Sequence, residues 1–382
     1  MARRFDLDAA LRPALRGMDG YEPIEPPEEA AARYGVAPED VVKLDGNENP
    51  YGPSPRARKA LAGGYEAHRY PDPDQRRLRA AIAARHAIPE SSIVAGAGAD
   101  ELIDLVFRVF VDPGDRIVIA SPTFGMYGFG ARLYGAVLVD APRHEADWSL
   151  DADALVEAAE GAKVVFIPSP NNPTGGLLPP DVCERLLASG ALLVVDEAYI
   201  EFAHGESLVS LAAAGDAPLI VLRTFSKWAG IAGLRVGYGV MPRAVAEAFM
   251  QWKQPYGVSV AAEAAAIASI EDAMLLDERA CEIAGERERL EAGLRDGGWL
   301  EPAPSEANFL LCRMSDRLGG DGAALREALA RRGVFVRFFS DPRLRRHVRI
   351  SVGTPTDTDR VLAALDEAGR ELAGPAPRGG AR

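Results

Sequence analysis

The stretch Leu219-Ile220-Val221-Leu222-Arg223-Thr224-Phe225-Ser226-Lys227 begins as an apolar run and ends on a lysine. A short apolar run bounded by polar residues is typical of a strand buried on both faces. Comparable runs recur at residues 92–96, 116–120, 164–168, 192–196 and 236–241, and amphipathic helical patterns separate them. This alternation predicts an α/β fold with a mostly parallel sheet flanked by helices on both faces.

The pattern changes after the sheet. Residues 259–300 are mostly helical and are expected to connect two domains. Strand-like runs at 308–313, 334–338 and 348–352, with helical segments near 322–332 and from 357, then predict a smaller α+β domain. We therefore assign an N-terminal arm with part of the small domain to 1–45, the large domain to 46–275, the C-terminal small domain to 276–370 and a disordered tail to 371–382.

Composition excludes several classes of function. The 382 residues are 48% hydrophobic and 26% charged, as in an ordinary globular protein. The net charge of −13 argues against nonspecific nucleic-acid binding. The five histidines show no metal-ligand spacing and the three cysteines form no CxxC pair, so no metal site is expected and the thiols are expected to be reduced. Neither a signal peptide nor a membrane span is recognisable, which favours a cytoplasmic protein.

Several polar residues follow the predicted strands directly. Gly98-Ala99-Asp100 follows the first strand, Asn172 comes after 164–168, Asp196 ends 192–196, and Lys227 follows 219–223. Ligands of open α/β sheets bind beyond the carboxyl ends of the strands. The convergence of these residues predicts a single site at that edge.

Lys227 is the first candidate for chemistry. The chain has only five lysines and uses arginine almost everywhere else. A lysine amine can be tuned to act as a nucleophile or a base, whereas arginine stays protonated. The alternative is a surface lysine on a loop.

Asp196 begins Asp-Glu-Ala-Tyr and ends an apolar strand, with the phenol of Tyr199 three residues later. A buried carboxylate is costly unless a cation or donor meets it, and a protonated pyridine nitrogen would do so. Such a pair would keep pyridoxal phosphate electron-poor. The alternative is an aspartate that caps the next helix.

Three further segments suggest contacts to a phosphorylated ring. In 169–175, Ser-Pro-Asn-Asn-Pro-Thr-Gly, Asn172 could donate to a phenolate oxygen, or the segment could be a self-satisfied turn. In 96–101, Gly-Ala-Gly-Ala-Asp-Glu, a helix N-terminus could bind phosphate together with Ser226 and Arg235, although a lone G-x-G is often only a tight turn. Phe124 could stack on the ring or belong to the core.

Together these residues resemble fold-type-I, pyridoxal-phosphate-dependent aminotransferases, and most closely the histidinol-phosphate aminotransferase family. The resemblance spans about residues 20–365. It is carried by the strings at 43–55, 69–72, 98–101, 122–127, 169–175, 196–202, 223–227, 233–235, 308–309 and 348–354.

The resemblance implies roles for the cofactor site. Lys227 would form the internal aldimine and act as the base for the proton shift, and Asp196 would pair with the ring nitrogen. Asn172 and Tyr199 would bind the ring oxygen, and Phe124 would stack where tyrosine is common. The residues implied to hold the phosphate are Gly98, Ala99, Asp100, Ser226, Arg235 and, from the neighbouring subunit of a homodimer, Tyr70.

The resemblance also implies a substrate. Arg349 would bind its anionic group, with Arg337, Tyr21, Asn47 and Tyr256 as weaker candidates. The expected reaction moves an amino group from L-histidinol phosphate to 2-oxoglutarate, which are a small amino donor and a 2-oxo acid. The alternatives are an aromatic-amino-acid aminotransferase, a lyase similar to threonine-phosphate decarboxylase, and a binding protein that kept the fold without catalysis. Trp228 and Gly46 depart from the common family pattern.

Overall fold

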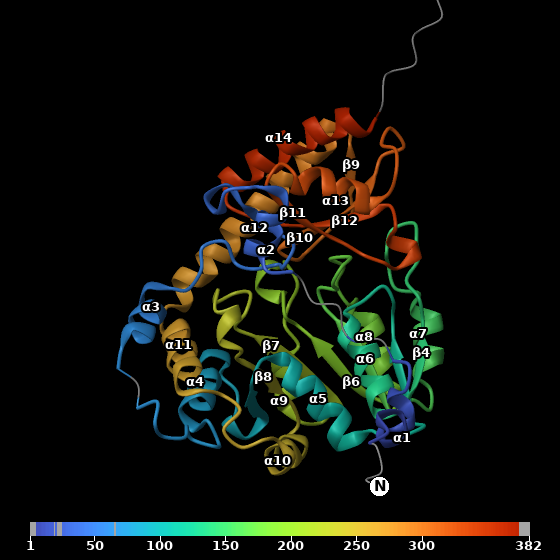
Figure 1. Ribbon diagram of the computed structural model, residues 1–382. Helices are drawn as coiled ribbons and strands as arrows, with labels where there is room; N and C mark the ends of the chain where they lie inside the picture. The colour runs from blue at the N-terminus through green and yellow to red at the C-terminus, as the bar shows by residue number, and fades with distance from the viewer. Residues whose placement is uncertain (1–4, 19, 21–24, 65, 374–382) are drawn as a thin grey trace, which may run out of the picture.

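The computed structural model describes residues 5–18, 20, 25–64 and 66–373. Two sheets organise the molecule, a large one low in Figure 1 and a small one above it, and helix α12 (Ala273–Gly297) runs alongside both. The first helices, α1 (Leu7–Ala10), α2 (Pro27–Tyr34) and α3 (Pro55–Ala62), come from the N-terminal quarter of the chain.

The large sheet has seven strands in the order β2-β8-β7-β6-β5-β3-β4. Only β8 runs antiparallel to its neighbours, so the prediction of a mostly parallel sheet is confirmed. The strands are β2 (Ile93–Gly96), β3 (Arg116–Ile119), β4 (Val137–Asp140), β5 (Val164–Pro168), β6 (Leu192–Asp196), β7 (Leu219–Thr224) and β8 (Gly237–Val240). The edge strand β4 was not predicted, because its run of large aliphatic residues, Val137-Leu138-Val139, is short and its side chains are exposed or only partly buried.

Helices cover both faces of this sheet. Along β6, Val194 packs in one core cluster and Val195 in the other, because successive strand residues point to opposite faces. Burial on both faces explains why these strands are continuous apolar runs. The covering helices are α4 (Arg76–His86), α5 (Ala99–Phe110), α6 (Gly125–Tyr134), α7 (Ala152–Ala159), α8 (Pro180–Ala188), α9 (Val209–Ala214), α10 (Arg243–Trp252) and α11 (Val260–Glu271).

The small sheet has five strands in the order β1-β11-β12-β10-β9. They are β1 (Val42–Leu44), β9 (Leu300–Pro302), β10 (Phe309–Met314), β11 (Val334–Phe338) and β12 (His347–Ser351). Strand β1, from the N-terminal arm, runs parallel to β11, so the chain leaves the small sheet before building the large one. Helices α12, α13 (Gly322–Ala330) and α14 (Pro355–Leu372) contribute to a separate apolar core on this sheet.

The predicted disordered tail at 371–382 and the predicted domain boundaries have different outcomes. Helix α14 continues to Leu372, so the first residues of the predicted tail are helical, and residues 374–382 lie outside the described part. The domain boundaries at 45, 275 and 370 stay predictions. Within the described residues, every helix is too short or too polar to cross a bilayer.

Candidate active site

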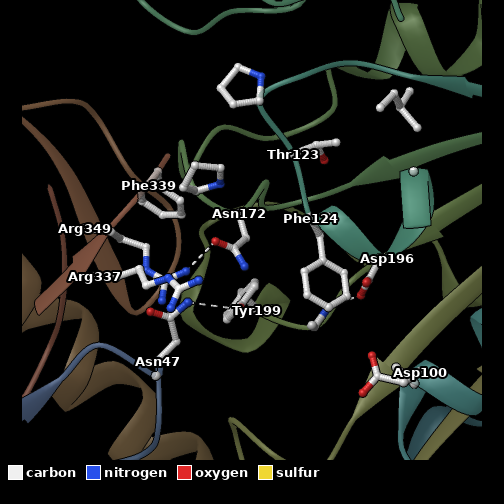
Figure 2. A pocket seen from close by; sticks show the side chains of 18 of the residues that line it. Asn47, Asp100, Thr123, Phe124, Asn172, Asp196, Tyr199, Arg337, Phe339 and Arg349 are labelled. Atoms are coloured by element: carbon white, nitrogen blue, oxygen red, sulfur yellow. Dashed lines mark hydrogen bonds between the residues drawn. The ribbon is translucent and has the colours of Figure 1, made fainter. Parts of the chain in front are cut away.

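A cavity of about 560 Å³ lies between the carboxyl edge of the large sheet and the small sheet. Its volume is within the usual range for small-molecule sites, roughly 300–1,000 Å³. Figure 2 shows side chains from both sheets pointing into it. Twelve residues predicted for the site line it, namely Asn47, Ala99, Asp100, Phe124, Asn172, Asp196, Tyr199, Ser226, Lys227, Arg235, Arg337 and Arg349.

Lys227 follows β7 and enters this cavity. Its Nζ donates a hydrogen bond to the carbonyl of Gly46 at 2.9 Å. Asn49 Nδ2 donates to the carbonyl oxygen of Lys227 at 3.0 Å, which holds the backbone at this position. Burial, together with the positive charge of Arg349, lowers the pKa of the Lys227 amine to about 8. The reactive neutral amine is therefore far more accessible near neutral pH than on a surface lysine.

Asp196 ends β6 as a buried carboxylate. Its Oδ2 accepts a hydrogen bond from the hydroxyl of Tyr127 at 2.8 Å, and its Oδ1 accepts one from the Ala198 N–H at 3.1 Å. Burial raises the pKa of Asp196 to about 6, while both hydrogen bonds act in the opposite direction. No arginine or lysine of the described residues forms an ion pair with it. The hydrogen bond from the Ala198 N–H resembles a helix cap and engages only Oδ1. A cationic ring nitrogen would compensate the negative charge of the Asp196 carboxylate.

Asn172 and Arg349 meet across the two sheets. Arg349, on β12, donates from Nη1 to the Asn172 amide oxygen at 2.6 Å and from Nη2 to the Asp45 carbonyl at 2.6 Å. With its oxygen engaged, Asn172 presents its amide nitrogen to the cavity (Figure 2). The neighbouring Asn171 instead donates from its amide nitrogen to the Pro122 carbonyl and the Thr174 hydroxyl. Asn171 therefore has the structural role of a turn residue, and the adjacent Asn172 is the one that faces the cavity.

Tyr199 is oriented by Asn47. Asn47 Nδ2 donates to the Tyr199 hydroxyl oxygen at 3.1 Å, which leaves the phenolic hydrogen to be donated elsewhere. Asn47 itself has a φ of 53° and is held through its backbone N–H and side-chain oxygen by Ser351. A left-handed non-glycine residue that is fixed on several sides is typical of a functional site.

The opposite end of the cavity suits a phosphate. The N-cap residue of α5, Gly98, provides no side-chain cap, so the first amides of the helix stay available to an anion. Arg235 Nη2 pairs with Asp100 Oδ2 at 2.8 Å, and Arg235 Nη1 lies 3.4 Å from Ser226 Oγ. A Cβ at position 98 would lie 2.6 Å from Arg235 Nη2, so a glycine is needed for the guanidinium to lie there.

These groups fit pyridoxal phosphate. One cavity brings together a lysine and groups for each part of the cofactor. It has a carboxylate for the ring nitrogen, an amide and a phenol for the ring oxygen, and a helix N-terminus with an arginine for the phosphate. Phe124 lines the same cavity and meets Tyr127 edge-on, with centroids 5.6 Å apart. Among the described residues, no group of three or more His, Cys, Asp and Glu could hold a metal.

Of the three remaining predicted tyrosines, Tyr70 and Tyr256 do not line this cavity. Tyr70 is 82% exposed and stacks on Tyr256 at 4.6 Å between centroids, and neither ring lines the pocket of its own chain. Tyr256 is 42% exposed, and its contact with substrate stays a prediction. Tyr21 lies outside the described residues.

The structure also adds residues that the sequence did not assign. Tyr127 contacts Asp196, Asn49 bonds the Lys227 backbone, and Ser351 and Asn308 hold Asn47. Their types alone carry no signal, since buried polar side chains of this kind usually satisfy the backbone. The available indication was their position, since all four lie in strings that carry the family resemblance, at 43–55, 122–127, 308–309 and 348–354.

Comparison with known proteins identifies the family. The family model for aminotransferase class I and II matches residues 39–365. The chain belongs to the class I and II aminotransferase family. A histidinol-phosphate aminotransferase of Roseiflexus castenholzii is 49% identical over 368 residues, covering 94% of this chain and 97% of that protein. A chloroplastic one of Nicotiana plumbaginifolia is 44% identical, covering 95% of this chain and 87% of its own length.

The solved structures agree with the aminotransferase fold. The histidinol-phosphate aminotransferase of Sinorhizobium meliloti, solved in complex with pyridoxal-5'-phosphate, superposes with a TM-score of 0.82 at 29% identity. The alignment covers 94% of this chain and 98% of that one. This aminotransferase is therefore a fold-type-I, pyridoxal-phosphate-dependent enzyme.

Proposed function

We propose that this aminotransferase converts L-histidinol phosphate and 2-oxoglutarate to imidazole-acetol phosphate and L-glutamate, a step of histidine biosynthesis. The observation that carries the proposal is the presence of Arg349 and Arg337 in the same cavity as Lys227. Two guanidiniums suit a phosphate or carboxylate on the substrate, since arginine binds both groups in bidentate fashion. The full-length similarity to histidinol-phosphate aminotransferases supports this substrate.

Each side chain has a defined task in this mechanism. When bound, pyridoxal phosphate supplies an aldehyde that joins an amine and a ring that accepts electrons. Asp196 would hold the ring nitrogen protonated, and Asn172 and Tyr199 would donate to the ring oxygen. Gly98, Ala99, Asp100, Ser226 and Arg235 would hold the phosphate.

Lys227 would move the proton. Its amine has a pKa of about 8 and is therefore able to exist as a base near neutral pH. In the neutral form, Nζ takes the proton from the substrate carbon that bears the amino group. The neighbouring carbonyl of Gly46 accepts a hydrogen bond from Nζ and keeps the amine directed into the cavity.

A homodimer with shared sites is part of the proposal. Tyr70 is exposed on its own chain, stacked on Tyr256, and is the residue that resembles a tyrosine contributed to the neighbouring subunit's phosphate. An exposed aromatic pair is a common feature of protein interfaces. The cytoplasm is the proposed compartment, because Cys183, Cys281 and Cys312 are all unpaired.

A panel of amino donors tests the substrate. The protein with bound pyridoxal phosphate is mixed with histidinol phosphate, glutamate, phenylalanine or threonine phosphate, and loss of the absorbance of the covalently held cofactor is followed. Fast conversion by histidinol phosphate and glutamate is expected. Preference for phenylalanine would indicate an aromatic aminotransferase, and release of carbon dioxide from threonine phosphate would indicate a lyase. A protein that binds no pyridoxal phosphate would contradict the whole proposal.

A further inference from the structure

Five aromatic rings form a continuous column beneath the cavity. Tyr134 stacks on Phe107 at 5.6 Å between centroids, Phe107 on Phe166 at 5.3 Å, and Phe166 on Tyr127 at 5.0 Å. Phe124 then meets Tyr127 edge-on. The column joins α5, α6 and β5, and it ends at the ring that lines the cavity. Its members are packed too closely to shift independently.

Tyr127 is the member of this column that contacts Asp196. Its side chain is fully buried, and its hydroxyl donates to Asp196 Oδ2 at 2.8 Å. Tyr127 does not line the cavity, so it reaches the site only through Asp196 and Phe124. The hydroxyl has no role in packing the column, since phenylalanine would fill the same ring positions.

We propose that Tyr127 is a positioning residue whose hydroxyl orients the Asp196 carboxylate and stabilises its negative charge. The inference rests on the proposed function, in which Asp196 pairs with the cofactor's ring nitrogen. Because one oxygen accepts from Tyr127 and the other from the Ala198 N–H, these two donors set the plane of the carboxylate. Such support around a contacting residue commonly controls its orientation and charge.

The charges that face Asp196 make this hydroxyl important. Asp100 on α5 and Glu197 next along the chain both disfavour ionisation of Asp196, and burial has the largest effect in the same direction. The groups that favour ionisation are the Tyr127 hydroxyl and the Ala198 amide. Tyr199, also nearby, is a neutral phenol whose pKa is raised by burial. Without the Tyr127 hydroxyl, the Ala198 amide would be the one remaining donor that favours the ionised form of Asp196. Burial and the carboxylates of Asp100 and Glu197 would all act against it.

Tyr127→Phe tests the proposal in the protein loaded with pyridoxal phosphate. The acid limb of the pH profile of turnover is expected to move up by about one pH unit, as loss of a hydrogen bond to a charged group implies. The dissociation constant for pyridoxal phosphate, measured by absorbance titration of the protein freed of cofactor, is expected to rise about tenfold at pH 6 and less at pH 8.

Tyr134→Phe is the matched control. Tyr134 belongs to the same column and also donates its hydroxyl to a carboxylate, Asp104 Oδ1 at 2.8 Å, but it does not contact Asp196. The Tyr134→Phe variant is expected to have the same pH profile of turnover and the same affinity for pyridoxal phosphate as the wild-type protein. Equal effects of the two variants, or an unshifted profile in Tyr127→Phe, would overturn the proposal.

A double variant separates orientation of Asp196 from general packing. In an Asp196→Asn background, Tyr127→Phe is expected to change cofactor affinity less than twofold, since no carboxylate remains to be stabilised. A further full tenfold loss would overturn the proposal. If wild-type protein binds no pyridoxal phosphate, the proposed function fails, whereas an unaffected Tyr127→Phe protein with normal wild-type binding contradicts only the role of Tyr127.

Discussion

Arg349 and Asn172 lie in different sheets and are joined by a hydrogen bond of 2.6 Å from the guanidinium to the amide oxygen. The contact connects strand β12 of the small sheet to the loop after β5 of the large sheet. This single hydrogen bond orients both the side-chain amide nitrogen of Asn172 and the guanidinium of Arg349. The position of the small sheet relative to the large one is therefore part of the chemistry of the site.

Arg349→Gln is expected to lower kcat/KM for the anionic substrate roughly a hundredfold. The change removes a charged donor to Asn172 and, under the proposed function, to the substrate, and hydrogen bonds to charged groups contribute about 1.5–3 kcal/mol. Steady-state kinetics with histidinol phosphate measure the effect. Arg313→Gln, on the exposed side of β10, is the control and should retain wild-type values. Equal kinetics for both variants would show that Arg349 does not bind the substrate.

Lys227→Ala is expected to abolish transamination and the absorbance of covalently held pyridoxal phosphate. Lys227→Arg should fail as well, because a guanidinium stays protonated and cannot act as nucleophile or base. Lys59→Ala, on the exposed face of α3, should behave as wild type. Stopped assays and absorbance spectra report both properties. Normal turnover in Lys227→Ala would refute the assignment of this lysine.

The rate of cofactor attachment is expected to rise with pH through about 8. The pKa of Lys227 is lowered to about 8, so the fraction of neutral amine grows as pH increases through that value and then levels off. At pH 7 roughly a tenth of the amine would be neutral. In Arg349→Gln the rise should move to higher pH, because a positive charge that disfavours the protonated amine has been removed. Rapid-mixing absorbance measurements follow the rate, and a rise centred near 10 would contradict the lowered pKa.

Gly98→Ala is expected to weaken binding of pyridoxal phosphate tenfold or more. Gly98 has a φ of +83°, and a Cβ there would lie 2.6 Å from Arg235 Nη2, so Arg235 would have to leave its position. Gly190→Ala is the matched control, because Gly190 has a φ of +82°, a Cβ there meets nothing within 4 Å, and the residue does not line the cavity. Titration of each cofactor-free protein compares the two. Unchanged affinity in Gly98→Ala would argue against a phosphate site beside Arg235.

Mixed dimers test the sharing of sites. Lys227→Ala and Tyr70→Phe proteins are each expected to show low activity, and co-expressed mixed dimers should recover part of the wild-type rate. In such a dimer, one of the two sites would combine an intact Lys227 with an intact Tyr70 from the other chain. Activity no higher than the average of the two parents would contradict a contribution of Tyr70 across the interface.

The central strands could be predicted because packing imposes a visible pattern on them. The bounds of β5 and β6 agree with the apolar runs at 164–168 and 192–196, since both faces of each strand are buried. Strand β4 at the sheet edge was missed, because its run of large aliphatic residues, Val137-Leu138-Val139, is short. Strand β1 was missed for a different reason, because its three residues become a strand only by pairing with β11.

The candidate site was predictable only in part. Asp196, Asn172 and Lys227 follow strands of the same sheet, so their convergence could be inferred from the chain direction alone. Tyr127 and Asn47 could not be assigned in this way, because their roles depend on which atoms reach them in space. For Tyr256, which does not line the cavity of its own chain, the predicted substrate contact stays a prediction.

The sequence by itself determined the parallel sheet and the edge at which its chemical groups gather, because apolar runs and the residues directly after them are local features. The tertiary structure alone decided which atoms of those groups face the cavity. Arg349 engages the Asn172 oxygen, Asn47 engages the Tyr199 hydroxyl, and Tyr127 engages Asp196, each through a contact between segments far apart in the chain. Hydrogen-bond direction and burial depend on such contacts, and they set the charge of Asp196 and the basicity of Lys227.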